Sequence, residues 1–208
     1  MTKIMFSLIT LAFAAGTLSA QENLLKNGGF EQIVKKTKSG DRYIQEKIKA
    51  GWNFGAGPLA KVPAEWIPNL GSAKLEIADA EKEKENVHEG RYAMRLTTGE
   101  KSGAHIYTSG ATAGKYEITV WAKGKGKFSV IGYFYSKDPQ SGKTRYVASV
   151  TLIQGTAKEN SWTEFKKRID TAKIKPEAGS FKLALSSGKN SCIVFDDVKL
   201  SPESVQEH

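Results

Sequence analysis

Apolar residues recur at every second position in many short runs of this chain, and this periodicity constrains the fold more than any other feature. Between residues 115 and 123, Tyr116, Ile118 and Val120 alternate with Glu117 and Thr119. Such alternation is typical of a β-strand that buries one face. Similar runs occur at residues 92–97, 127–135, 145–153, 163–169, 181–185 and 192–200, and glycine-containing turn signals separate them. Many short strands at this spacing predict an all-β protein, either a two-sheet antiparallel sandwich or a barrel.

Three regions depart from this pattern. Residues 33–38 and 43–48 flank Ser39-Gly40-Asp41 and predict an extra hairpin. Residues 79–89 are highly charged and carry no apolar stripe, so we expect a solvated loop there rather than a helix. Residues 51–58 are rich in glycine and contain Trp52 and Phe54, which indicates a loop with two aromatic side chains.

The first twenty residues read as a secretory signal peptide. Lys3 precedes an apolar run from Ile4 to Ala15, and small residues follow up to Ala20. A membrane anchor is the alternative, but this run is shorter than the ~20 residues that span a bilayer. No later run is long and apolar enough to predict a transmembrane helix. We therefore expect export, to the periplasm or outside the cell, of a single domain formed by residues 21–208.

The net charge bears on the class of binding partner, and the single cysteine bears on disulfide formation. The formal net charge is +9, which favours acidic partners; the alternative is that the scattered lysines only confer solubility. Nucleic acid is a poor candidate, because the chain is expected to be exported and has no compact basic motif. The single cysteine, Cys192, excludes an intramolecular disulfide, and its strand-like neighbours predict a buried thiol.

Motifs for catalysis are not found. His88, His105 and His208 do not occur at metal-ligand spacing, and no Gly-x-Ser-x-Gly nucleophile elbow is present. Several glutamates are available for a glycosidase pair, but nothing in the sequence brings two of them to the required separation. We therefore predict that the protein is not an enzyme.

Six segments, taken together and in order, resemble the jelly-roll carbohydrate-binding modules of the galactose-binding-like superfamily, especially the type attached to xylanases and β-glucanases. The matching segments are Asn27–Glu31, Pro63–Trp66, Val87–Leu96, Gly114–Lys123, Ser161–Phe165 and Phe195–Leu200. The resemblance implies a two-sheet antiparallel β-sandwich with sugar-binding aromatic residues on one face or at a loop rim. It also implies a structural calcium ion that joins the two ends of the chain.

The resemblance places this calcium between the first and last strands. Glu31 and either Asp196 or Asp197 would supply carboxylates, and Gly29 and the region of Glu89 would supply further oxygens. If the apolar residues that follow Asp197 point into the core, Asp196 shares their side at its rim. A carboxylate there is costly unless it is paired or bound to a metal, so we favour Asp196 as the ligand. The alternative is that these acids are solvated or paired with lysines.

Sugar recognition requires flat apolar rings, and the resemblance directs attention to the aromatic residues. The supply is Trp52, Phe54, Trp66, Trp121, Tyr133, Tyr135, Tyr146 and Trp162. Strand parity predicts that Trp121 points away from the core. Tyr133 and Tyr135 also point outward if Phe128, Val130 and Phe134 are buried, although Ile131 argues for the reverse, and they would then form one platform with Trp121. Trp52 would contact ligand from its loop or pack across the edge of the sandwich, whereas Trp66 and Trp162 match structural positions.

We therefore predict a secreted, non-catalytic protein that binds a polysaccharide or oligosaccharide through Trp52, Trp121, Tyr133 and Tyr135 on a calcium-stabilised jelly roll. The positive charge favours an acidic polysaccharide. One alternative is a structural or protein-interaction domain of the cell envelope on the same fold. Another is a polysaccharide-processing enzyme.

Overall fold

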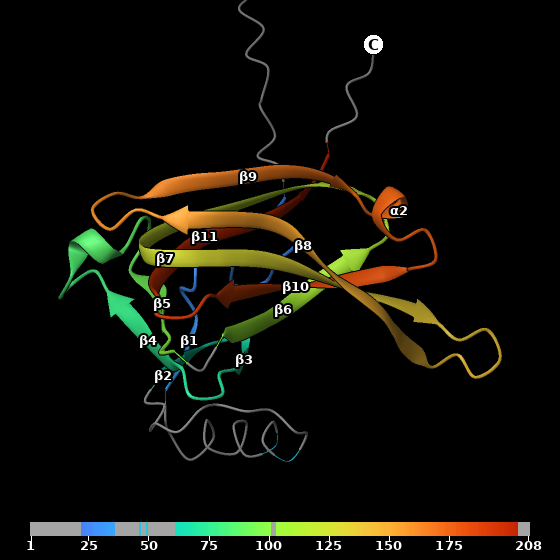
Figure 1. The fold of residues 1–208 in the computed structure, drawn as a ribbon, viewed down its shortest axis with the longest axis horizontal. Coiled ribbons are helices and arrows are strands. Elements are labelled where there is room, and N and C mark those ends of the chain that lie inside the picture. The colour runs from blue at the N-terminus through green and yellow to red at the C-terminus, as the bar shows by residue number, and fades with distance from the viewer. Residues whose placement is uncertain (1–21, 36–45, 47–48, 50–60, 101–102, 204–208) are drawn as a thin grey trace, which may run out of the picture.

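The computed structural model describes residues 22–35, 46, 49, 61–100 and 103–203, and these form an all-β sandwich (Figure 1). The signal peptide prediction and Trp52 lie outside the described residues. The strands are β1 (Ile33–Lys35), β2 (Lys61–Pro63), β3 (Ile67–Asn69), β4 (Lys74–Asp79), β5 (Tyr92–Thr97), β6 (Ala104–Thr112), β7 (Lys115–Lys137), β8 (Thr144–Ala157), β9 (Thr163–Asp170), β10 (Ser180–Ser187) and β11 (Cys192–Pro202). The short helical elements are η1 (Lys84–Asn86) and α2 (Thr171–Ile174). In this part of the chain no helix has the length and apolar character required to cross a bilayer.

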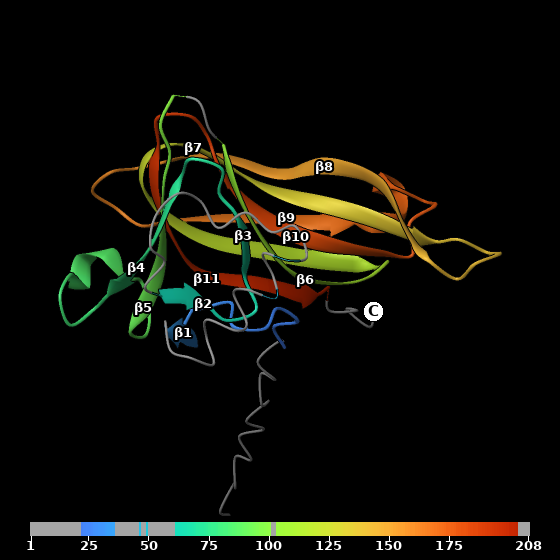
Figure 2. The same ribbon diagram turned by 90° about the horizontal axis from the view of Figure 1, so that it is seen from below.

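One strand, β7, belongs to both layers of the sandwich. Its first half pairs with β9 and β11, and its second half pairs with β10 and β8. Sheet 1 has the order β3-β6-β10-β7-β8, and sheet 2 has the order β4-β5-β11-β7-β9. The hairpin of β7 and β8 extends beyond the rest of the sandwich in both views (Figures 1 and 2).

Two glycines allow β7 to pass from one sheet to the other. Gly124 and Gly126 have φ values of 126° and 118°, a backbone region that favours glycine. A Cβ on Gly124 would lie 2.1 Å from the carbonyl oxygen of Cys192. The sequence predicts a turn between two separate strands here, whereas the structure has a bend within one continuous strand. Glycine in a strand commonly marks such a bend.

The core lies between the two sheets and follows the predicted parity. Ile118 and Val120 in the first half of β7, and Phe128, Val130 and Phe134 in the second half, are buried. Phe128 of sheet 1 meets Phe195 of sheet 2 with 5.4 Å between ring centroids. The expected two-sheet antiparallel sandwich is therefore confirmed.

The two ends of the described chain lie side by side, as the resemblance to carbohydrate-binding modules implies. Leu24 N donates to Leu200 O at 2.8 Å, and Val198 N donates to Gly28 O at 3.0 Å. Figure 2 shows this N-terminal segment, in blue, running beside β11. Trp66 is buried and its indole nitrogen donates to Asn27 O at 2.9 Å, which confirms its structural role.

The expected hairpin of residues 33–38 and 43–48 lies largely outside the described residues; within them, β1 pairs with β2, and Glu46 lies in helical backbone. The charged segment after β4 is largely exposed, as expected, although it contains the short helix η1 and buries Val87 against the outer face of sheet 2. The predicted buried thiol is wrong: Cys192 is exposed, since it begins β11 on the outward side, opposite to its buried neighbour Ile193.

Candidate functional site

Aromatic side chains gather on the outer face of sheet 1. Burial of Phe134 and its alternating neighbours turns Tyr133 and Tyr135 outward, as parity predicts. Tyr146 of β8 lies opposite Tyr135 in the strand register, and Tyr107 of β6 reaches the same face from the other side of β10. We call the hollow bounded by Tyr107, Tyr133, Tyr135 and Tyr146 the tyrosine cleft.

The rings of the tyrosine cleft contact one another in a chain. The centroid of Tyr133 lies 5.0 Å from that of Tyr107 and 6.5 Å from that of Tyr146. Tyr146 lies 6.0 Å from Tyr135 and is itself 53% exposed. The rings are tilted against each other rather than coplanar, so they form a curved wall instead of a flat platform.

Burial also shifts the pKa values of polar groups in and beside the cleft. Desolvation, together with the hydrogen bond from Tyr107, raises the pKa of Tyr133 far above its ordinary value. Desolvation likewise raises the pKa of Tyr135 and lowers the pKa of His105, whose Nδ1 lies 3.5 Å from the Tyr133 hydroxyl. Tyr133 and Tyr135 therefore keep their hydroxyl protons at neutral pH, and these hydroxyls can both donate and accept hydrogen bonds.

The cleft has a volume of about 630 Å³, and its remaining lining is mostly polar. Those lining residues are Glu65, Ile67, Asn69, Thr108, Ser109 and Lys182. The hydroxyl oxygen of Ser109 is buried without a hydrogen-bond partner among the described residues, and Lys182 Nζ lies 5.7 Å from the centre of the Tyr135 ring. A second hollow of about 630 Å³, lined by Thr112, Thr144 and Ser180 among others, shares Tyr135 and Lys182 with the first. We call these two adjoining hollows the groove.

The structure separates Trp121 from these tyrosines, so the predicted common platform is wrong. Trp121 does point away from the core, but it lies on the half of β7 that belongs to sheet 2. Its ring is stacked under that of His88, with centroids 3.9 Å apart and 19° between planes. The alternation of apolar residues predicts correctly which face each half of β7 buries. It does not predict that β7 changes sheet between the two halves.

Sequence reasoning missed Tyr107 and gave no reason to prefer Tyr146. The signal for Tyr107 is weak but present, because Ala104 and Ile106 alternate with His105 and Tyr107 in β6. Tyr146 depends on register, which is shifted by an irregularity between Phe134 and Tyr135. Its position could not be read from alternation alone.

A second group of functional candidates lies where the two ends of the chain meet. We call this the chain-end junction, a hollow of about 370 Å³ lined by Gly29, Glu31, Glu89, Gly90, Asp196, Asp197 and Lys199. It brings together all four residues that the sequence nominates for calcium. Four carboxylates surround one lysine there, and Lys199 Nζ pairs with Asp197 Oδ2 at 2.7 Å.

Asp196 is 0% exposed and is held by backbone amides. Oδ2 accepts from His88 N at 2.9 Å and Glu89 N at 3.1 Å, and Oδ1 accepts from Asp197 N at 2.7 Å. Burial raises the pKa of this carboxyl to about 7, although the three amide bonds favour the charged form. A β-bulge between Asp196 and Lys199, with Asp197 at φ 45°, turns Asp196 to the outer face. Strand parity predicts Asp196 on the same side as the core residues that follow it, and this is wrong, because the bulge intervenes. The preference for Asp196 over Asp197 as a metal ligand stays a prediction.

The oxygens of the junction fit a hard divalent cation in type and charge. Glu31 Oε1 accepts from Arg91 N at 2.9 Å and Tyr92 N at 3.1 Å, which leaves Oε2 without a partner in this part of the chain. The Glu89 carboxylate and Asp197 Oδ1 likewise have no hydrogen bond or ion pair with a described residue. Asp196 retains one of the roughly four acceptor positions of a carboxylate.

No family model matches the chain. One curated protein, halomucin of Haloquadratum walsbyi (strain DSM 16790 / HBSQ001), is 26% identical in an alignment of 183 residues that covers 78% of this chain and 2% of halomucin. The chain thus spans a small fraction of that relative.

Several solved structures are similar in fold, and carbohydrate-binding modules are prominent among them. A family 61 module in complex with β-1,4-galactotriose has a TM-score of 0.47 and 20% identity over 88% of this chain and 99% of its own. A family 22 xylan-binding domain has a TM-score of 0.46 and 14% identity over 68% and 88%. The family 22–glycoside hydrolase 10 modules of a Clostridium thermocellum xylanase, complexed with xylohexaose, have a TM-score of 0.47 and 16% identity over 67% and 26%. The chain is similar to carbohydrate-binding modules. Its fold is established by its own strand pairing.

Proposed function

We propose that the protein binds carbohydrate without cleaving it, and that the ligand lies in the tyrosine cleft. The observation that carries the proposal is the curved wall of Tyr107, Tyr133, Tyr135 and Tyr146, with the buried, unpartnered hydroxyl of Ser109 in its lining. Aromatic faces cover the apolar C–H groups of a pyranose, while convergent polar groups bind its hydroxyls. Each tyrosine supplies both functions, since its ring is apolar and its uncharged hydroxyl can donate and accept.

The lining supports binding rather than hydrolysis. Glu65 is the one carboxylate among the described residues that line the cleft, whereas glycoside hydrolysis by the usual mechanism requires two. The groove also continues past Tyr135 toward Thr144 and Ser180, which suits an extended chain of sugars more than a single residue. The proposed ligand is therefore a polysaccharide or a long oligosaccharide.

An acidic sugar is the finer part of this proposal. Lys182 lines both halves of the groove and forms no ion pair with a described residue. Its ammonium group is therefore available for a uronate or sulfate group, and the net charge of +9 would attract a polyanion. Export of the chain by the segment at residues 1–20 would bring the cleft to such polymers.

Calcium at the chain-end junction is a separate proposal, supported by the convergence of its oxygens. Glu31, Glu89, Asp196 and Asp197 would hold the ion with the carbonyl of Gly29. Bound there, it would neutralise carboxylates that Lys199 alone does not balance and stabilise the contact between the chain ends.

Affinity electrophoresis in gels that contain neutral or acidic polysaccharides tests the carbohydrate proposal. We expect retardation of the protein by at least one polymer, and loss of that retardation in Tyr133→Ala and Tyr107→Ala. Tyr92→Ala, a half-buried tyrosine on sheet 2, is the matched control and should migrate as the parent does. No retardation in any polymer, or equal loss in all three variants, would contradict the proposal. Capture of an envelope protein through the same tyrosines would favour the protein-interaction alternative, and shortening of the polymer would favour the enzyme.

A further inference from the structure

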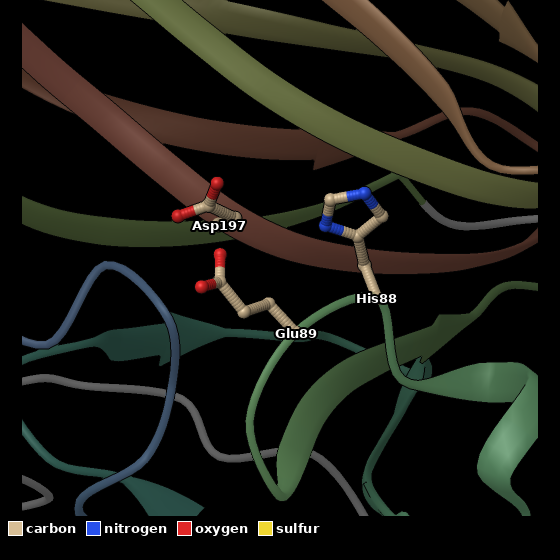
Figure 3. Close-up of side chains that lie close together, drawn as sticks. All are labelled: His88, Glu89 and Asp197. Carbon is tan, nitrogen blue, oxygen red and sulfur yellow. The ribbon is translucent and has the colours of Figure 1, made fainter.

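A histidine joins two carboxylates at the edge of the chain-end junction. One ligand atom each from His88, Glu89 and Asp197 lies within 4.8 Å of the others (Figure 3). Figure 3 shows the carboxylates of Glu89 and Asp197 on the same side of the imidazole, facing its Nδ1 edge. Nδ1 is buried and has no hydrogen-bond partner among the described residues. Its lone pair or N–H group therefore faces the two carboxylates without a bond.

The surroundings hold these three residues in place. Stacking on Trp121 at 3.9 Å fixes the plane of the His88 ring, and Trp162 packs edge-on at 5.6 Å. The backbone amides of His88 and Glu89 both bond to Asp196 Oδ2. Asp196 therefore fixes the backbone that carries His88 and Glu89.

We propose that His88, Glu89 and Asp197 form a binding site for a borderline divalent metal ion, for which Zn²⁺ is the probe. Imidazole suits Zn²⁺ and related transition ions, whereas Ca²⁺ takes oxygen ligands. Ligand atoms bound to one tetrahedral Zn²⁺ lie about 3.3 Å apart, since Zn–N and Zn–O distances are about 2.0–2.2 Å. The three ligand atoms lie within 4.8 Å of one another, so the side chains must close toward the ion, and the exposed side chain of Glu89 has room to move. A solvent molecule or a ligand oxygen would complete the coordination.

The site does not depend on the proposed carbohydrate function, because the tyrosine cleft lies on the other sheet. It shares Glu89 and Asp197 with the oxygens proposed for calcium, and His88 is the residue that distinguishes the two. Asp197 Oδ2 is already paired with Lys199, so Oδ1 would be the ligand atom.

Calorimetric titration of the full, tag-free chain with Zn²⁺ and separately with Ca²⁺ tests the proposal. We expect one Zn²⁺ per chain and an at least tenfold weaker affinity in both His88→Gln and Glu89→Gln. His105→Gln, a histidine outside the junction, should bind Zn²⁺ as the parent does. His88→Gln should leave the heat of Ca²⁺ binding unchanged, because that ion uses oxygens.

A second readout protects the test against a variant that fails to fold. Tetrahedral Co²⁺ bound through nitrogen and oxygen should give visible absorption bands in the parent protein, and these bands should be lost in Glu89→Gln, whose exposed side chain has no packing role. Absence of Zn²⁺ binding by the parent would overturn the proposal. So would retention of Zn²⁺ affinity in both His88→Gln and Glu89→Gln, or an equal loss in His105→Gln.

Discussion

Tyr107 and Tyr133 stand on strands that are not neighbours, yet their ring centroids are 5.0 Å apart. The strand between them, β10, places Ala184 on the row of Tyr107. Ala184 is 0% exposed although it lies on the outer face of the sheet. We infer that this small side chain leaves room for the two rings to meet across β10 and form the wall of the tyrosine cleft.

Enlarging Ala184 should open the cleft wall. In Ala184→Leu, the added atoms have no space beneath the two rings, and overpacking of this kind costs about 1–3 kcal/mol. We expect at least a tenfold loss of glycan affinity, measured by calorimetry, together with a lower free energy of unfolding in urea. Ala184→Gly, which adds no volume, should retain most of the affinity. Equal affinity in the parent and Ala184→Leu would show that the rings do not act together.

Removing the positive charge of the groove should separate acidic from neutral ligands. Lys182→Met keeps the aliphatic stem over Tyr135 but removes the ammonium group. We expect weaker retardation by an acidic polysaccharide and unchanged retardation by a neutral one, and the difference should shrink as salt is added. Lys189→Met, an exposed lysine at the β10–β11 turn, controls for the loss of overall charge. An equal effect of both variants would assign the attraction to net charge alone.

His105 should make stability decrease in acid. Burial lowers its pKa below the ordinary value of 6.5, so the unfolded chain binds the proton more readily than the folded chain does. The free energy of unfolding should therefore be unaffected by His105 above pH 6.5 and should fall as the pH decreases through the folded-state pKa. Urea unfolding between pH 8 and pH 5 would show a shallower decline in His105→Gln than in the parent. Parallel profiles would contradict this assignment, because the other titrating groups are common to both proteins.

Strand parity could be read from the sequence where alternation is unbroken. Phe128, Val130 and Phe134 were correctly placed in the core, and Tyr133 and Tyr135 on the outside. The resemblance to carbohydrate-binding modules likewise located the terminal motifs, which do meet at the junction. Strand parity depends only on neighbouring residues, and the meeting of the chain ends follows from the order of the motifs.

The failures share one physical cause, which is that backbone irregularities change the face that a residue occupies. Alternation cannot show that β7 changes sheet at Gly124 and Gly126, so Trp121 was grouped with tyrosines of the other sheet. The bulge at Asp197 reversed the side expected for Asp196. The spacing of the histidines gives no sign of a metal site at His88, because Glu89 and Asp197 approach its ring together only in the folded chain.

The bend of β7 should depend on Gly124. A side chain there would face the carbonyl oxygen of Cys192 at 2.1 Å and would also require a φ of 126°. We expect Gly124→Ala to lower the free energy of unfolding by roughly 3 kcal/mol or more, as the sum of backbone strain and a steric clash. Gly179→Ala has open space around the new Cβ and should change it by less than about 1 kcal/mol. Urea denaturation of both variants checks this, and similar stabilities would show that the bend does not require glycine.

Calcium at the chain-end junction should raise the thermal stability of the whole sandwich, because it would clamp the first segment of the chain to β11. An ion present at about 100 times its dissociation constant stabilises the folded state by roughly 2.7 kcal/mol, which corresponds to a rise in Tm of about 5–10 °C for a domain of this size. Calorimetry of the parent in Ca²⁺ and in a chelator measures this increment. Glu31→Gln should abolish the increment, whereas Glu159→Gln, an exposed acid outside the junction, should keep it. The increment, rather than the absolute Tm, is the decisive quantity, because Glu31 also accepts two backbone hydrogen bonds whose loss would lower Tm with or without the ion. An identical Tm of the parent in Ca²⁺ and chelator would refute a structural calcium site and leave Asp196 as a carboxylate satisfied by amides alone.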